Sequence, residues 1–337
     1  GGLGCMKLVL RVSPRYETPA WLPAAALGGS VLAGLAAVGV MFAASGVDPF
    51  YAIARIFGGS FGSLYGLGET VTKAIPLILI ASGLAVAFRA RFWNIGAESQ
   101  LLLGATLAGW VGLHWQLPGP LLVAAMFAAG FVGGALWGLV PAVLRVRFGV
   151  NEVISTLMLN YIASELLTLL VTGPWKGRTQ QGFPYTDDLA GPATLAVIPG
   201  TRIHVVTLVL ALATALLLHV LVQRTRFGYE LRVIGENREA ARYAGIDLGR
   251  ATLLLMLVSG GVAGLAGVGE VAGVHHHLTY PGAISSGYGF TAIIVAWLGR
   301  LSPLGTVLSG FFFAGILVGG DAIQISLGLP AATVQVF

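Results

Sequence analysis

Residues 251–273 read ATLLLMLVSGGVAGLAGVGEVAG and carry no charge before Glu270. About 20 consecutive apolar residues suffice for a helix to cross a bilayer. The glycine-rich part of this run, residues 260–269, presents little side chain, and small residues let membrane helices approach one another closely. The stretch therefore predicts a membrane-spanning helix that packs tightly against its neighbours.

Composition extends this prediction to the whole chain of 337 residues. The sequence is 56% hydrophobic and only 10% charged, whereas soluble domains carry about 25% charged residues. We therefore expect an all-α, polytopic integral membrane protein with about ten spans, formed as one domain over residues 1–337. The predicted spans are 20–45, 70–88, 98–115, 119–143, 152–173, 202–222, 251–273, 283–299, 303–320 and a tenth from about 330. The sequence stops at Phe337 inside the tenth, so we expect a truncated or re-entrant last helix.

Basic residues predict the orientation of these spans. With the N-terminus in the cytoplasm, the cytoplasmic segments hold most of the 19 basic residues: Lys7, Arg11, Arg15, Arg89, Arg91, Arg145, Arg147, Arg224, Arg226, Arg232, Arg238, Arg242, Arg250 and Arg300. The external segments hold Arg55, Lys73, Lys176, Arg178 and Arg202. This asymmetry follows the positive-inside rule. It also explains the net charge of +5 without a nucleic-acid partner.

Three stretches lie outside the predicted spans. Residues 46–69 are rich in glycine and aromatic residues, which indicates an external or interfacial segment. Residues 174–201 form the longest predicted external loop, and residues 223–250 the longest cytoplasmic loop. The sequence lacks the glycine-rich phosphate loop of ATPases, so we expect no ATP hydrolysis by this chain. The single cysteine, Cys5, excludes an internal disulfide and a cysteine metal site.

The long cytoplasmic loop contains a charged island, GENREAARYAGI, at residues 235–246. Residues 236–244 predict a short helix, with the small residues Ala240, Ala241 and Ala244 on a face that another protein can approach closely. Gly245 predicts a left-handed cap at its end. The alternative is a solvated helix that only links two spans.

Four stretches, in order, resemble one family of membrane proteins. They are FWNIGAESQLLLGA at 92–105, VNEVISTLMLNYIA at 150–163, GYELRVIGENREAARYAGI at 228–246 and GYGFTAIIVAWLGRLSPLGT at 287–306. Together they resemble the permease subunits of bacterial ABC importers for nucleosides and simple sugars, within the group that includes ribose and branched-chain amino acid permeases.

The resemblance implies a transporter subunit that is not itself an enzyme and binds no cofactor. ATP and Mg²⁺ would bind a separate ATPase subunit. A second permease subunit would complete a heterodimeric pore, and an extracytoplasmic substrate-binding lipoprotein would deliver the cargo across the bacterial cytoplasmic membrane. The cargo expected is a nucleoside, with a simple sugar such as ribose as the alternative. The resemblance assigns contact with the ATPase to the island residues Gly235, Glu236, Asn237, Glu239, Ala240, Ala241, Ala244 and Gly245.

Polar and aromatic residues at membrane depth are candidates for the translocation pathway. They are Asn94, Glu98, Asn160, Tyr288 and Phe290. Each has a structural alternative: Asn94 as a helix N-cap with Glu98 in the first turn, Asn160 as a bond to a neighbouring helix, and the two aromatic residues as part of an interfacial belt.

The remaining ionisable residues give weaker signals. Glu165, Glu270 and Asp321 lie near predicted external helix ends, where solvated carboxylates are expected. The run His275 to His277 is a poor chelate, because adjacent residues do not share a helix face. An ion-coupled secondary transporter is the main rival class, but its coupling acids would lie at mid-membrane. The sequence places no cluster of catalytic residues at membrane depth, which argues against a membrane-embedded enzyme.

Overall fold

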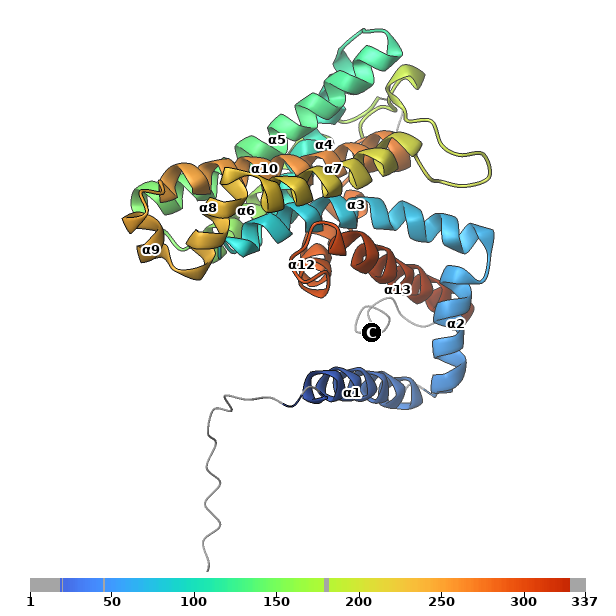
Figure 1. The fold of residues 1–337 in the computed structure, drawn as a ribbon. Helices are drawn as coiled ribbons and strands as arrows, with labels where there is room; N and C mark the ends of the chain where they lie inside the picture. Colours follow the sequence, from blue (N-terminus) through green and yellow to red (C-terminus); the bar gives the residue numbers. More distant parts are fainter. Residues whose placement is uncertain (1–18, 20, 45, 179–181, 328–337) are drawn as a thin grey trace, which may run out of the picture.

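The computed structural model describes residue 19 and residues 21–44, 46–178 and 182–327. In these ranges the chain is helical, and the strand-like pairing is limited to an isolated bridge between Val197 and His204. Figure 1 shows the arrangement of the helices. They are α1 (Leu22–Ala44), α2 (Pro49–Phe61), α3 (Leu64–Arg89), α4 (Ala97–His114), α5 (Gly119–Phe148), α6 (Glu152–Thr172), η1 (Gly191–Ala193), α7 (Val205–Arg224), α8 (Arg226–Glu236), α9 (Arg238–Tyr243), α10 (Leu248–Gly269), η2 (Glu270–His275), α11 (Pro281–Ile284), α12 (Tyr288–Leu298) and α13 (Gly305–Leu327).

Glycines bring α10 against α4 and α5 at the centre of the bundle. A Cβ atom added to Gly260 would lie 2.5 Å from the carbonyl oxygen of Gly134. One added to Gly264 would overlap the backbone of α5, and one added to Gly267 would overlap that of α4. The predicted close helix contacts of residues 260–269 are confirmed.

Helix α3 lies inside the bundle and is buried on nearly all sides from Ala74 to Phe88. A helix that is apolar all round belongs in such a position. Helix α13 packs on α3 and on α2, where the hydroxyl of Ser60 donates to the carbonyl oxygen of Gly315. Residues 46–69, predicted to be an external or interfacial segment, form α2 and the start of α3, and α2 packs against α13.

Seven helical segments of the described part are long and apolar enough to cross a membrane, and an eighth span results if the bent pair 32–44 and 49–61 is counted as one. The sequence predicts about ten. Helix α4 is shorter and begins with polar residues, which lowers its mean hydropathy. The predicted tenth span lies outside the described residues. The all-α, polytopic membrane architecture is shown, and the number ten and the orientation remain predictions.

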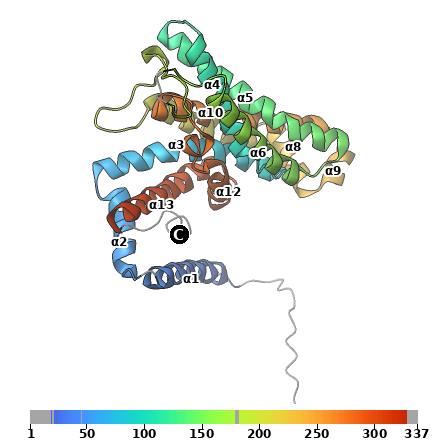
Figure 2. The same ribbon diagram turned by 180° about the vertical axis from the view of Figure 1, so that it is seen from behind.

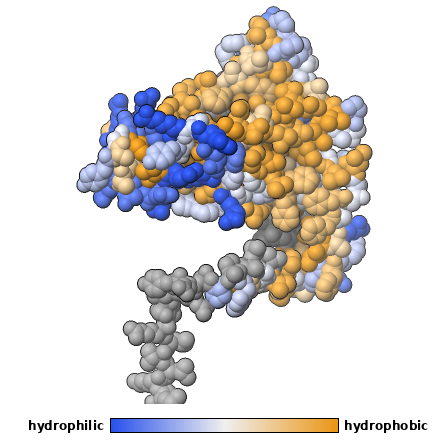
Figure 3. Space-filling view, in the orientation of Figure 1, coloured by the Kyte–Doolittle hydropathy of each residue, from blue (hydrophilic) through white to orange (hydrophobic). Residues whose placement is uncertain are grey.

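The two long loops lie at opposite ends of the bundle. Helices α8 and α9 project at one end, and residues 182–201 of the other long loop lie at the opposite end, as both views of the ribbon show (Figures 1 and 2). The surface over α8 and α9 is strongly hydrophilic, whereas the flank of the bundle beside it is hydrophobic (Figure 3). Predicted cytoplasmic and external loops are thus separated by the length of the bundle.

Candidate functional site

A buried polar junction connects the break between α3 and α4 to α10. Asn94 is fully buried in this break. Its Nδ2 donates to Gln100 Oε1 at 2.9 Å and to Ser259 Oγ at 3.2 Å, and its Oδ1 accepts from Gly96 N at 3.1 Å. Gly96, not Asn94, is the N-cap of α4. The N-cap role considered for Asn94 is therefore wrong, and the residue braces the break against α10 instead.

Helix α6 holds the same break from its other side. Asn160 Nδ2 donates to the carbonyl oxygen of Ile95 at 3.0 Å, and its Oδ1 accepts from Ser99 N at 3.1 Å. Thr156 Oγ1 accepts from Ile95 N at 3.3 Å. These bonds satisfy backbone groups that have no helical partner at the start of α4. Asn160 thus bonds a neighbouring segment. Asn151 caps the start of α6, where its Oδ1 accepts from Val153 N at 2.9 Å.

Glu98 joins α4 to α12. It lies in the first turn of α4, as predicted, and its Oε2 accepts from Gly289 N in the first turn of α12 at 2.7 Å. Gly287 is the N-cap of α12 and has a φ of 86°. Helix N-termini carry partial positive charge and unpaired N–H groups. One carboxylate therefore stabilises two helix starts inside the protein.

A cavity of about 260 Å³ opens beside this junction. It is lined by Glu98, Leu102, Leu157, Asn160, Tyr161, Ser164, Pro281, Gly282, Ser285 and Phe290. Tyr161 and Phe290 are 64% and 44% exposed, and the polar side chains of Glu98, Asn160, Ser164 and Ser285 line the same cavity. Aromatic faces stack on flat apolar groups, and the polar side chains supply hydrogen-bond partners.

The cavity gathers three of the five predicted pathway residues: Glu98, Asn160 and Phe290. Asn94 and Tyr288 are buried elsewhere and do not line it. Sequence reasoning missed Tyr161 and Ser164. A helical signal for Ser164 was present, because it follows Asn160 by four residues and so shares its face.

The charged island folds differently from the single helix predicted for residues 236–244. Glu236 ends α8, and the chain breaks at Asn237, whose Oδ1 caps α9 by accepting from Glu239 N at 2.9 Å and Ala240 N at 3.1 Å. A side chain oxygen that satisfies two free N–H groups favours a new helix start over continuation. The predicted left-handed cap is confirmed, because Gly245 has a φ of 74°.

The island also packs against its own chain. Gly235 is buried, and a Cβ atom there would overlap the carbonyl oxygen of Arg89. Ala241 is fully buried in the main core. The predicted contact face of Ala240, Ala241 and Ala244 is therefore split, with only Ala240 and Ala244 exposed. Beside them lie the exposed Glu239 and the 94% exposed Tyr243.

At the opposite end, the predicted external acids differ in exposure. Glu165 is exposed, and Asp321 is exposed and paired with Lys73. Glu270 is buried within the π-helical turn η2, so the prediction of a solvated carboxylate there is wrong. The turn directs its side chain into the bundle.

The histidine-rich turn after α10 makes protein contacts. His277 Nδ1 lies 3.3 Å from Asp188 Oδ1, and its ring packs at an angle of 32° against that of Tyr185. Nearby, His204 is buried ahead of α7, with its Nδ1 2.7 Å from Thr207 Oγ1. Burial, reinforced by Arg202, lowers the pKa of His204 to about 4. The described residues contain no cluster of side chains suited to a metal ion.

A multi-pass helical bundle with a partly polar cavity and a capped short helix at one end fits a membrane transport protein. The chain belongs to the family described as "Branched-chain amino acid transport system / permease component", whose model matches residues 66–337. It is an ABC importer permease of the ribose and nucleoside type.

Curated relatives support this membership. The chain is 38% identical to a glucose ABC transporter permease of Haloferax volcanii, over 98% of this chain and 89% of the relative. It is 32% identical to a guanosine ABC transporter permease of Bacillus subtilis, over 91% and 88%. A nucleoside ABC transporter permease of Lactococcus lactis is 29% identical, over 88% and 83%. No solved structure matches the chain significantly.

Proposed function

We propose that this chain carries nucleosides through a pathway that includes the cavity beside Glu98. The observation that carries the proposal is the convergence of two aromatic side chains, Tyr161 and Phe290, with the polar groups of Glu98 and Asn160 around one space. A nucleoside has a flat base that stacks on aromatic rings and a ribose that needs hydrogen-bond partners. The nucleoside and guanosine permeases among the relatives support this cargo.

The pathway needs a second permease subunit in this proposal. Tyr161 forms a wall of the cavity and yet is largely exposed, so the cavity is open on one side in the single chain. A partner subunit placed there would complete the pore. The guanosine system of Bacillus subtilis provides two different permease relatives, which supports a heterodimer.

The energy would come from a separate ATPase subunit that binds ATP and Mg²⁺. Its contact surface is the exposed face of α9, made by Glu239, Ala240, Tyr243 and Ala244 together with Glu236 and Asn237. The buried Gly235 and Ala241 and the cap at Gly245 would hold α9 in position. A substrate-binding lipoprotein would dock at the opposite end of the bundle. The complex would lie in the cytoplasmic membrane of a bacterium.

A simple sugar is the second candidate cargo. The glucose permease of Haloferax volcanii is 38% identical to the chain. An aromatic face also stacks on the apolar face of a sugar ring, so the same cavity suits either ligand.

Uptake measurements test these proposals. Proteoliposomes would contain the chain with its ATPase, second permease and lipoprotein, and the tracers would be labelled guanosine and labelled glucose. We expect ATP-dependent guanosine uptake; ATP-dependent glucose uptake alone would assign the sugar instead. Ion-driven uptake by this chain without the ATPase would overturn the importer mechanism in favour of a secondary transporter.

A further inference from the structure

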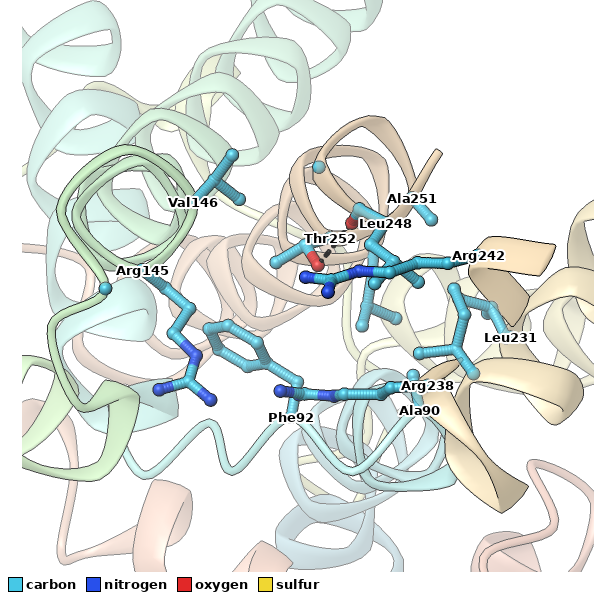
Figure 4. Close-up of a pocket in the computed structure, with 14 residues that line it drawn as sticks. Ala90, Phe92, Arg145, Val146, Leu231, Arg238, Arg242, Leu248, Ala251 and Thr252 are labelled. Atoms are coloured by element: carbon cyan, nitrogen blue, oxygen red, sulfur yellow. Dashed lines mark hydrogen bonds between the residues drawn. The ribbon is translucent and has the colours of Figure 1, made fainter. Parts of the chain in front are cut away.

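A second cavity, of about 340 Å³, lies underneath α9. Its walls are the C-terminal end of α5, the first turns of α10, and α8 with α9. Arg238 and Arg242 are four residues apart on α9 and so share one face. Figure 4 shows their side chains reaching from one wall and that of Arg145 from the opposite wall toward the same opening.

The charge around this cavity is unbalanced. Three arginines line it, and none of the lining residues, all within the described ranges, is acidic. Arg145 also pairs with Glu152, whose Oε2 lies 3.2 Å from Arg145 Nη1. A guanidinium has five N–H donors, so Arg145 keeps donors for a ligand, and Arg238 and Arg242 face the cavity from α9. Three converging guanidinium groups match a phosphate, which accepts several charge-assisted hydrogen bonds.

Below the arginines the cavity is apolar. Phe92, Leu231 and Ile234 form part of this floor with Leu248 and Leu255. Val146 belongs to the wall and is also exposed on the flank of α5, where Phe148 is 72% exposed. The cavity is therefore continuous with an apolar outer surface at the end of a membrane-spanning helix. A ligand with a phosphate and a hydrocarbon part fits this change from basic to apolar lining. Basic pockets near the end of a membrane-spanning helix suit anionic lipids.

We propose that this cavity binds the phosphate of an anionic phospholipid, which links α5 to α9. The headgroup phosphate contacts Arg145, Arg238 and Arg242, and the acyl chains follow the exposed apolar residues of α5. The ligand would brace α9 from below while its opposite face stays exposed. This bracing role rests on the proposed function, because it assumes that α9 transmits force from the ATPase; the binding itself does not depend on it.

A lipid titration tests the site. The delipidated full chain in detergent is titrated with phosphatidylglycerol or with phosphatidylcholine of the same acyl chains, and bound lipid is counted by native mass spectrometry. The double variant Arg238→Gln, Arg242→Gln is compared with the control Arg224→Gln, Arg226→Gln, which removes two exposed arginines of the same loop outside this cavity. Because each basic side chain contributes about 1 kcal/mol to anionic lipid binding, we expect about thirtyfold weaker phosphatidylglycerol binding in the first variant.

The control should bind phosphatidylglycerol within about threefold of the native chain. Equal losses in both variants, or equal binding of the two lipids by the native chain, would overturn the site. Inorganic phosphate and ATP are titrated in parallel as soluble phosphate ligands. If either binds in an arginine-dependent way and phosphatidylglycerol does not, the ligand of the cavity is a soluble phosphate and not a lipid.

Hydrogen exchange tests the brace separately. Phosphatidylglycerol should slow amide exchange in residues 238–246 of the native chain and leave the double variant unchanged. Exchange that does not respond to bound lipid would overturn the bracing role. Neither readout involves uptake, so a failed transport assay and a failed lipid site remain distinguishable.

Discussion

Glu98 and Gly289 lie 191 residues apart in the chain and are joined by a 2.7 Å hydrogen bond from a backbone N–H to a carboxylate. The bond links the start of α4 to the start of α12 at the edge of the cavity that also contains Phe290. A shift of either helix would therefore change the shape of the cavity, which couples helix position to the space available for cargo.

Replacing Glu98 separates this structural role from proton coupling. Glu98→Ala leaves the buried N–H of Gly289 without its acceptor, which costs about 1–3 kcal/mol, so we expect that loss of stability and at least tenfold slower uptake. Glu98→Gln keeps an acceptor oxygen and should retain most of both. Thermal unfolding in detergent and initial uptake rates provide the readouts. Equal impairment of the two variants would indicate that ionisation of Glu98 is required, as in an ion-coupled transporter.

Removing the aromatic wall should weaken cargo binding. We expect Phe290→Ala to raise the KM for guanosine uptake about 2–10-fold, because an aromatic stacking contact contributes about 0.5–1.5 kcal/mol. Phe312→Ala is the matched control, since Phe312 is similarly exposed and lies outside the cavity. A normal KM in Phe290→Ala would remove this residue from the pathway.

Some of this arrangement was predictable because it depends on local sequence. Apolar runs locate most of the helices, Asn151 and Gly245 give the caps that their types favour, and the glycines of α10 indicate close packing. Glu98 and Asn160 line one cavity, in keeping with the rule that polar groups at membrane depth are seldom without a partner.

Prediction from the sequence was wrong where contacts between distant segments determine the position of a residue. The burial of Ala241 depends on a core that includes residues far from α9 in the sequence, so helix periodicity could not show which face is free. Asn94 looked like a local cap, but its partner Ser259 lies 165 residues away. Glu270 looked solvated because the π-helical turn that directs it inward has no composition signal.

The split face of α9 predicts opposite outcomes for two adjacent substitutions. Ala241→Glu places a carboxylate in the core, where an unpaired charge costs several kcal/mol, so we expect loss of folded protein. Ala240→Glu adds charge to an exposed position and should fold normally while it weakens ATP-driven uptake. Yield of monodisperse protein and coupled ATPase activity distinguish the two. Normal coupling in a well-folded Ala240→Glu variant would contradict the docking of the ATPase on this face.

The close contact of α10 with α5 predicts that a side chain at Gly264 destabilises the protein. Gly264→Val forces bulk against the backbone of α5, and overpacking of this kind costs about 3 kcal/mol. We expect a matching fall in thermal stability. Gly58→Val in α2 is the control, because a Cβ atom there has no neighbour within 4 Å. Similar stability of the two variants would show that α10 and α5 separate more easily than the structure indicates.

His204 predicts a pH dependence of stability at the end of the molecule opposite α9. Burial and the nearby Arg202 lower the pKa of His204 to about 4 in the folded chain, while an unfolded histidine has a pKa of about 6.5. Between these two values the unfolded chain binds the additional proton, so folding stability falls as the pH decreases from about 6.5 to about 4. Above about 6.5 the contribution of His204 is complete.

Substitution of His204 isolates this contribution from that of other groups. His204→Gln keeps a polar side chain but cannot titrate, so thermal unfolding between pH 4 and pH 7 should depend less steeply on pH in this variant than in the native chain. The exposed His114, replaced by Gln, is the matched control. This control differs from His204 in burial, so it reports the effect of removing an exposed histidine. Identical slopes for the native chain and both variants would show that another group governs the acid sensitivity of this end.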